Sequence, residues 1–151
     1  MLIDSWFSLV RLSTAESPIT ARRGPVARAE ISLAILKRAL EAHPQNRTSV
    51  RLRTAYLEAG EVIWKRDEQA QAWETALKDL GGTGIDLGSR EAVWSAWVSW
   101  AMRNAKNMDD FLPCFRRAFA VFNSEEAEVI RVRLLWRLCT HLHESGKRQS
   151  S

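Results

Sequence analysis

The sequence predicts an all-α fold, a right-handed α-α superhelix (solenoid) of about seven antiparallel helices. Three observations indicate it. Apolar residues recur at helical spacing along most of the 151 residues, no segment shows the alternation of a strand, and patterns of helix pairs repeat about every 40 residues. Each pair in such an array buries its apolar face only against its neighbours. A plain helical bundle is the alternative.

The repeat is carried by residue size. In the second helix of each pair a small alanine stands among large apolar residues, and a helix breaker or turn former follows it. In the first helix of each pair a large aromatic residue recurs. A large side chain facing a small one lets neighbouring helices pack closely. The aligned positions are Ala39, Ala76 and Ala118, then Pro44, Gly81 and Asn123, and in the first helices Tyr56, Trp97 and Trp136.

The first part of the chain is expected to form three helices. Apolar spacing indicates a short helix over Leu2 to Leu12, followed by a linker from Ser13 to Pro25 that holds two prolines and a glycine. The second helix begins at Val26 and ends near His43-Pro44, because proline cannot continue the hydrogen-bond ladder. The third helix is expected from about Arg47 to Trp64.

The fourth helix is expected over Asp67 to Leu80 and ends at Gly81-Gly82. Its first turn is acidic, which suits the helix dipole. The stretch from Gly81 to Gly88 follows a helix and lacks the Gly-Lys-Ser/Thr ending of a phosphate cradle, so we interpret it as a flexible connector. Ser89 is expected to cap the fifth helix, with Glu91 in its opening turn.

The last two helices follow short turns. After a turn at Asn107 to Asp110 the sixth helix begins around Asp110, and Pro113 costs little there because the first N–H groups of a helix have no partner within it. The seventh helix is capped by Ser124 and runs to about His143, and residues 144–151 are expected to fray. The fifth helix, before them, carries Trp94, Trp97 and Trp100.

Length and composition suit one soluble domain. Residues 1–151 are interpreted as a single helical-repeat domain, a fragment of a longer protein, with repeat units at roughly 1–44, 45–82, 89–123 and an incomplete 124–145. Hydrophobic residues make up 46% and charged residues 26%, which is ordinary for a globular protein. Seven tryptophans against one tyrosine indicate extensive helix packing, an interaction surface, or both.

The two cysteines, Cys114 and Cys139, stand among apolar residues of helical patterns. We expect both to be buried free thiols, which fits a reducing cytosol or nucleus. No run approaches the roughly 18 apolar residues of a membrane span, and residues 1–10 lack the features of a signal peptide. We therefore expect a soluble intracellular protein that does not contact a membrane.

No pattern predicts catalysis, a cofactor or a metal. Cys139, His141, His143 and Glu144 are donor types for a metal, but on a helix His141 points away from the face that Cys139 and His143 share. The histidines and scattered serines show no context that would activate a nucleophile. We assign no catalytic, cofactor-binding or metal-binding residue, and we expect the protein not to be an enzyme.

The seventh helix carries apolar residues on two faces, which predicts burial on two sides. The second face is expected to meet the next repeat of a longer protein, a partner, or a second copy of the chain. One stripe consists of Ile130, Leu134, Leu138 and Leu142, and the other of Val129, Val132, Trp136 and Cys139.

Several motifs resemble those of a known family. The runs that carry the resemblance are Ile35 to Pro44 (ILKRALEAHP), Tyr56 to Trp64 (YLEAGEVIW), Trp73 to Leu77 (WETAL) and Val93 to Val98 (VWSAWV). They resemble the half-a-TPR (HAT) class of helical repeats of RNA-processing proteins. More narrowly, the stretch from Ile31 to Phe122 looks like the "necessary for RNA interference", or nuclear RNAi-defective, family.

The resemblance implies a nuclear, non-enzymatic adaptor in RNA silencing, splicing and RNA surveillance. Members of the family associate with the DExH-box RNA helicase of the nuclear exosome and with splicing-related proteins. The helicase-contacting part of such proteins lies outside the repeats, so we do not place it on residues 1–151.

Two binding functions remain open. The leading hypothesis is a scaffold whose inner groove binds a protein segment, and the alternative is an RNA-binding module. Trp100 is interpreted either as core or as an exposed anchor. The candidate residues for protein binding are Arg51, Arg53, Trp64, Trp100, Arg103, Arg131, Arg133 and Trp136.

The RNA-binding alternative rests on the distribution of charge. Residues 1–65 hold 10 Lys and Arg against 6 Asp and Glu, so the formal net charge of +4 comes from this part of the chain. A solvated basic face would give the same pattern. The basic residues concerned are Arg22, Arg23, Arg28, Lys37, Arg38, Arg47, Arg51 and Arg53.

Overall fold

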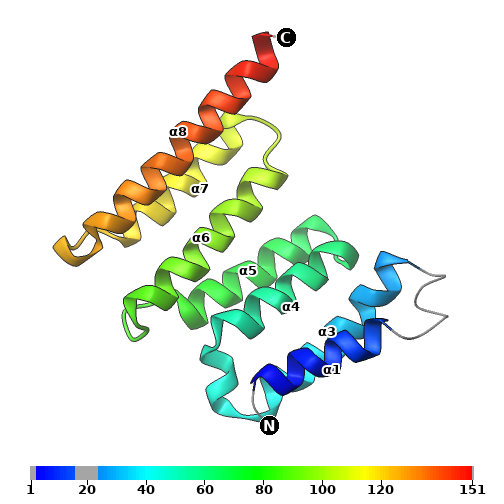
Figure 1. The fold of residues 1–151 in the computed structure, drawn as a ribbon. Coiled ribbons are helices and arrows are strands. Elements are labelled where there is room, and N and C mark those ends of the chain that lie inside the picture. Colours follow the sequence, from blue (N-terminus) through cyan, green and yellow to red (C-terminus); the bar gives the residue numbers. More distant parts are fainter. Residues whose placement is uncertain (1–2, 16–23, 151) are drawn as a thin grey trace. The chain divides into compact units, whose positions relative to one another are not determined.

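The computed structural model describes residues 3–15 and 24–150, and every regular element within them is helical (Figure 1). The all-α prediction is therefore confirmed for the described residues. The elements are α1 (Ile3–Ala15), α3 (Pro25–Ala42), the 3-10 helix η1 (Pro44–Thr48), α4 (Val50–Ile63), α5 (Arg66–Leu80), α6 (Leu87–Asn104), α7 (Met108–Val121), the 3-10 helix η2 (Glu125–Ala127) and α8 (Glu128–Ser150).

The chain divides into two compact units, Met1–Val93 and Trp94–Ser151, and the division falls inside α6. The first unit contains α1, α3, α4, α5 and the start of α6. The second contains the rest of α6 with α7 and α8. Each unit is described separately below.

The core of the first unit lies between α3 and α4, and α1 packs beside α3. Full burial of a leucine side chain contributes about 1.5–3 kcal/mol relative to leaving it exposed, so these contacts hold the three helices together. The buried cluster is Leu36, Ala39, Leu40 and Leu52, and the partly buried residues packed on it are Ile3, Trp6, Phe7, Val10, Ala55 and Tyr56.

The predicted linker from Ser13 to Pro25 is helical at both ends. Ser13 belongs to α1, and Pro25 is the first residue of α3. Proline is accepted there because the first N–H group of a helix has no partner within it. Residues 16–23 lie outside the described residues. As predicted, α3 ends just before Pro44.

The predicted start of the third helix at Arg47 is wrong, because a 3-10 turn intervenes. Pro44–Thr48 form η1, and α4 begins after Ser49, whose hydroxyl accepts a hydrogen bond of 3.2 Å from the Leu52 N–H. The buried side chain of Asn46 donates through Nδ2 to the Ala39 carbonyl at 2.7 Å. This bond satisfies a carbonyl in the last turn of α3 and fixes the corner between the helices.

The corner between α4 and α5 depends on a glycine. The ring of Trp64 folds back over Gly60, where an added Cβ would lie 2.2 Å from the indole, and it meets Tyr56 edge to face at 5.3 Å. Gln69 of α5 is buried and donates through Nε2 to the carbonyls of Trp64 (2.9 Å) and Glu61 (3.3 Å). These contacts connect the end of α4 to the start of α5.

Asp86, and not Ser89, caps α6. The helix begins at Leu87, and the Asp86 carboxylate accepts a hydrogen bond of 3.0 Å from the Ser89 N–H. The prediction that Ser89 caps this helix is therefore wrong. Hydrogen bonds from the Ser89 backbone and side chain hold the pKa of Asp86 below its ordinary value of 3.8, because they stabilise the charged carboxylate.

The core of the second unit is aromatic. Phe111 and Phe115 lie 6.3 Å apart on the inner face of α7, and His141 of α8 meets Phe111 at 5.1 Å. α7 and α8 lie side by side (Figure 1). The other buried residues of these two helices are Ala118, Ile130 and Leu134, with Phe122 and Ala127 between them.

Two arginines connect the helices of the second unit. Arg137 of α8 donates to the Ser95 carbonyl of α6 at 2.9 Å and to the Ser99 hydroxyl, and burial lowers the pKa of its guanidinium. Arg131 donates to the carbonyls of Phe122 (2.5 Å) and Ser124 (2.8 Å), which satisfies acceptors at the end of α7.

Three predicted boundaries in this unit are wrong. Asn107 caps α7 by accepting from the Asp110 N–H at 3.0 Å, so the helix begins at Met108. Pro113 then lies inside the helix, and the low cost expected for a first-turn proline does not apply. Ser124 precedes η2 without a side-chain cap bond, and α8 continues to Ser150, where fraying was predicted.

Candidate interaction surfaces

The most exposed apolar surface of the described residues in the second unit lies on α8. The helix has two apolar faces, as predicted. One face is buried through Ile130 and Leu134, and the other is exposed. We call the exposed face the α8 stripe. It comprises Val129, Val132, Leu135, Trp136, Cys139 and Leu142, all of them exposed.

The α8 stripe includes two leucines that were not predicted to belong to it. Leu142 was placed with Ile130 and Leu134, and Leu135 was not assigned to a face. At 100° per residue both leucines fall within the same arc of the helix as Val132 and Trp136. The angular position of each residue around the helix axis is therefore the signal that identifies both leucines.

Trp136 is 74% exposed, whereas Trp97, its counterpart in the repeat, is 4% exposed. Trp97 meets Trp94 edge to face at 5.5 Å, and the guanidinium of Arg117 lies over both rings, at 5.2 and 5.5 Å from their centroids. Arg117 was not among the predicted site residues. The same repeat position is therefore covered in one helix pair and open in the next.

The other tryptophan candidate in the second unit, Trp100, is buried. Its side chain therefore belongs to the core, as one of the two predictions had it. The other prediction, that Trp100 is an exposed anchor for a partner, is wrong, because a partner could reach the ring only by displacing the side chains around it. The apolar spacing of α6 could not separate the two readings, since both place the side chain on the same helix face.

The three arginine candidates of the second unit differ in what they do. Arg131 is used within the unit, where it binds the carbonyls that follow α7. Arg103 is exposed and lines a shallow cavity of about 420 Å³ together with Ser99, His141 and Glu144. Arg133 is exposed on α8 beside the α8 stripe.

The arginine candidates of the first unit both form ion pairs. Arg51 binds Asp4 at 2.5 Å and lies 4.3 Å from the centroid of Phe7, so it joins α4 to α1. Arg53 binds Asp79 at 3.0 Å and joins α4 to α5. The third candidate, Trp64, is half-buried over Gly60. All three are engaged within the unit.

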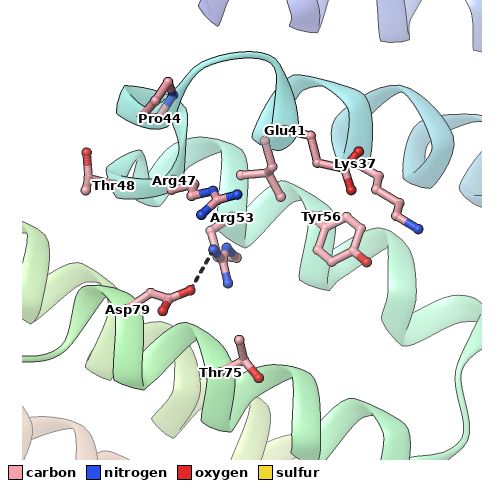
Figure 2. A pocket seen from close by; sticks show the side chains of 10 residues that line it. Lys37, Glu41, Pro44, Arg47, Thr48, Arg53, Tyr56, Thr75 and Asp79 are labelled. Atoms are coloured by element: carbon pink, nitrogen blue, oxygen red, sulfur yellow. Dashed lines mark hydrogen bonds and ion pairs between the residues drawn. The ribbon is translucent and has the colours of Figure 1, made fainter.

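A cavity of about 600 Å³ lies where α3, η1, α4 and α5 meet (Figure 2). Figure 2 shows Tyr56 of α4 and Thr75 of α5 facing it, with the Arg53–Asp79 ion pair on one side. The remaining lining residues are Lys37, Leu40, Glu41, Pro44, Arg47 and Thr48. The lining combines side chains of both charges with apolar side chains, so the cavity has no single sign of charge.

The residues of the RNA-binding alternative divide into three groups. Arg22 and Arg23 lie outside the described residues. Arg51 and Arg53 are neutralised by Asp4 and Asp79. The remaining four are exposed on α3 and η1: Arg28, Lys37, Arg38 and Arg47.

Both cysteines were predicted to be buried, and neither is. Cys139 is exposed on the α8 stripe, and Cys114 is half-buried, with its Sγ 3.8 Å from the Asp110 carbonyl. Among the described residues no group of three or more His, Cys, Asp or Glu is placed to hold a metal ion. No helix in the described parts of the chain is long and apolar enough to cross a membrane.

Residues 1–151 match a protein-family model described as NRDE-2, necessary for RNA interference. The match spans both units. No curated protein and no solved structure matches the chain.

Proposed function

Because this chain belongs to the family described as NRDE-2, necessary for RNA interference, we propose that it is a non-enzymatic protein–protein interaction scaffold of nuclear RNA processing. Family membership connects the chain with RNA interference, and the resemblance noted between Ile31 and Phe122 extends to residues 1–151. The scaffold binds a peptide or helical segment of a partner protein. Its nuclear location and its participation in splicing and RNA surveillance are parts of this proposal.

The helices are proposed to stack as a right-handed superhelix of HAT/TPR-like pairs. The repeat alanines support it, since Ala39, Ala76 and Ala118 are all fully buried. A repeat that places a small residue at each helix contact allows each pair to pack on the next. A stacked array exposes long helix faces, which suits the capture of a partner segment.

The observation that carries the proposal is the α8 stripe. Exposed apolar patches larger than a few hundred Å² are rare on soluble monomers and mark interaction sites. A tryptophan buries about 150–250 Å², worth roughly 25 cal/mol per Å² before the costs of association. Trp136, with 74% of its surface exposed, is therefore the expected centre of binding.

The partner is proposed to be a segment of a splicing- or exosome-associated factor. The nuclear exosome DExH-box RNA helicase is proposed to bind through a region outside residues 1–151, so it is not expected to compete for the α8 stripe. No cofactor is required, because the surface acts by binding alone.

The test is affinity capture from nuclear extract with the whole chain and with a matched pair of variants. Val132 and Val62 are 60% and 50% exposed, on α8 and α4 respectively. Val132→Asp places a charge in the α8 stripe, and Val62→Asp places one elsewhere. The wild type and Val62→Asp are expected to retain RNA-processing proteins after RNase treatment and at high salt, whereas Val132→Asp and Trp136→Ala lose them.

Retention of the same proteins by Val132→Asp and Trp136→Ala would refute the α8 stripe as the binding surface. Recovery of no RNA-processing protein by the wild type would refute the scaffold function. Circular dichroism of each variant shows whether its helices are intact, so loss of capture is not confused with unfolding.

An RNA-binding module is the second candidate, favoured by the four exposed cations Arg28, Lys37, Arg38 and Arg47. RNA affinity should then fall steeply with salt, because phosphate contacts release counterions. Reversing Lys37, Arg38 and Arg47 to Glu would abolish such binding, measured by fluorescence anisotropy with a labelled single-stranded RNA. Capture that survives RNase and is unaffected by these substitutions favours the scaffold.

A further inference from the structure

We propose that the cavity of Figure 2 binds the carboxylate of an acidic residue in a peptide segment, and that Arg47 is the residue that pairs with this carboxylate. The inference goes beyond the proposed function, because the cavity belongs to the first unit and the α8 stripe to the second. It follows from the charges, the hydroxyl groups and the apolar side chains that line the cavity.

The charged side chains of the cavity leave one cation in excess. Three cations, Lys37, Arg47 and Arg53, stand against two anions, Glu41 and Asp79. Asp79 pairs with Arg53 at 3.0 Å, and Glu41 lies one helical turn after Lys37 on α3, where the two charges offset each other. Arg47 has no ion-pair partner among the described residues. The unmatched positive charge of the cavity therefore belongs to Arg47.

This unmatched charge lies near a second guanidinium group. In the view of Figure 2, Arg47, Arg53 and Asp79 lie on one side of the cavity, and Lys37 and Tyr56 on the other. The Arg53 side chain is 11% exposed, so water screens its charge weakly. A carboxylate that enters on this side completes a set of two guanidinium groups and two carboxylates. The planar fork of Arg47 can hold it with two parallel hydrogen bonds.

The same charges disfavour a phosphate group as the ligand. A phosphate monoester carries about −1.5 to −2 charges at pH 7, and a nucleic acid presents a negative charge at every nucleotide. Glu41 and Asp79 line the cavity and would repel these additional charges. A ligand with a single negative charge matches the one cation in excess.

Two threonine hydroxyls indicate that the carboxylate is carried by a peptide. The hydroxyl of Thr48 donates to the Gln45 carbonyl at 2.9 Å, and that of Thr75 donates to the Gln71 carbonyl at 3.2 Å. A hydroxyl has one hydrogen, so toward the cavity both threonines can only accept. A peptide backbone supplies N–H donors for these acceptors, whereas a free carboxylate supplies none.

The apolar part of the lining can receive the neighbours of the acidic residue. The cavity of about 600 Å³ is larger than a carboxylate needs and is within the range of about 300–1,000 Å³ that ligand sites occupy. Leu40, Pro44 and the ring of Tyr56 contribute its apolar surface. An acidic residue flanked by apolar residues therefore matches the cavity in charge, in hydrogen bonding and in apolar contact.

The probe is the capped tripeptide acetyl-Leu-Glu-Leu-amide, and its uncharged match is acetyl-Leu-Gln-Leu-amide. Leucine on both sides supplies an apolar neighbour in either direction of the peptide. Each peptide is titrated into the whole ¹⁵N-labelled chain, and NMR spectra follow the backbone amides and the arginine Nε–H groups. Arg47→Glu reverses the proposed partner of the carboxylate. Arg38→Glu is the control, because Arg38 is exposed on α3 and does not line the cavity.

The wild type is expected to bind the glutamyl peptide with a Kd on the order of 1 mM, since a short flexible ligand gains little beyond the cost of association. The signals that shift should be those of residues that line the cavity, with the Arg47 Nε–H among them. The glutaminyl peptide should bind roughly fivefold more weakly or worse. Arg47→Glu should weaken binding by about tenfold or more, and Arg47→Lys severalfold, because lysine keeps the charge without the fork. Arg38→Glu should bind as the wild type does.

Equal binding of the glutamyl and glutaminyl peptides, or an equal loss in Arg47→Glu and Arg38→Glu, overturns the inference. So does the absence of shifts at the cavity with roughly 20 mM peptide. Because Arg47 is exposed and forms no ion pair among the described residues, its substitution should leave the fold intact, which the remaining signals of each variant report.

Two further ligands identify the source of the anion. Glutarate lacks the peptide backbone and is expected to bind more weakly than the glutamyl peptide, so equal binding would show that the site takes free acids and would overturn its assignment to a peptide. Tighter binding of inorganic phosphate at the same signals would overturn the choice of a carboxylate. Capture of nuclear proteins through Trp136 is measured separately, so either proposal can fail while the other stands.

Discussion

Arg53 of α4 and Asp79 of α5 form an ion pair of 3.0 Å in which the arginine side chain is 11% exposed and the aspartate side chain 42% exposed. Among the described residues, Asp79 is the acceptor that meets this guanidinium, and the Nε of Arg53 is buried without a partner. Arg53 was predicted to contact a partner protein, and in the structure it joins two helices of the first unit.

Replacing Asp79 with Asn should destabilise the first unit. The guanidinium of Arg53 would remain largely buried without its anion, which we expect to cost roughly 1–2 kcal/mol after allowance for the exposure of Asp79. Chemical denaturation followed by circular dichroism measures the change. Asp4→Asn breaks the more exposed pair with Arg51 and is the matched control, with an expected cost below about 1 kcal/mol. Equal costs for the two variants would contradict the argument.

Gly60→Ala should destabilise the corner between α4 and α5. The new Cβ would lie 2.2 Å from the Trp64 ring, so the indole must move and lose its edge contact with Tyr56. Such overpacking typically costs about 1–3 kcal/mol. At Gly82 an added Cβ meets nothing within 4 Å, so Gly82→Ala is the control in thermal denaturation. A Gly60→Ala variant as stable as Gly82→Ala would show that Trp64 moves freely.

Truncation of the two repeat tryptophans should have opposite effects on stability and binding. Trp97→Ala removes a buried ring and is expected to cost about 3–5 kcal/mol of unfolding free energy. Trp136→Ala removes an exposed ring and should change stability by less than about 0.5 kcal/mol while abolishing partner capture. Urea denaturation and affinity capture of both variants test this contrast. A large loss of stability in Trp136→Ala would mean that the ring is covered within the chain.

The start of α6 should weaken in acid. Ser89 holds the pKa of Asp86 below 3.8, so the folded helix favours the charged carboxylate. A depressed pKa contributes stability that is present above the unfolded value and lost as the pH falls through the folded value. NMR titration of the Asp86 carboxyl and hydrogen exchange of the Ser89 amide should show this change below pH 3.8. The Asp86→Asn variant is the control. It has no carboxyl group at this position, so hydrogen exchange of its Ser89 amide should not show the change that protonation of Asp86 causes in the wild type.

The exposed thiol of Cys139 gives a chemical test of the α8 stripe. A bulky maleimide should react faster with Cys139 than with the half-buried Cys114, because the thiolate must be reached by the reagent. Partner capture should protect Cys139, and prior modification should prevent capture. Mass spectrometry of the digested protein measures both rates, and a partner that leaves Cys139 fully reactive would not be bound across the α8 stripe.

The sequence predicted the helices better than it predicted their ends. Apolar spacing located the seven α-helices of the described residues, since a face that is buried must repeat every 3.6 residues, but it did not locate the two short 3-10 helices. The caps were less certain, because any Ser, Asp or Asn near a start can accept the first N–H bonds. Asp86 and not Ser89 caps α6, and Asn107 caps α7, so this helix begins at Met108 and not at about Asp110.

The candidate site was harder to predict, because the spacing of apolar residues shows that a helix has an apolar face but does not show whether another helix packs against that face. Trp100 and Trp136 both continue apolar stripes, yet one is buried and the other is 74% exposed. The difference depends on whether another helix lies against that face, which no local pattern contains. Arg51 and Arg53 were likewise predicted to bind a partner, and their acidic partners within the chain lie in other helices.

The position of the boundary within α6 has a practical consequence for dividing this protein. The unit boundary lies between Val93 and Trp94, in the middle of an unbroken helix from Leu87 to Asn104. Cleavage in the loop before α6 would remove Leu87–Val93 from the first unit, and cleavage after Asn104 would remove Trp94–Asn104 from the second. Each half expressed alone should therefore keep the complete helix, so the two fragments would overlap in sequence from Leu87 to Asn104.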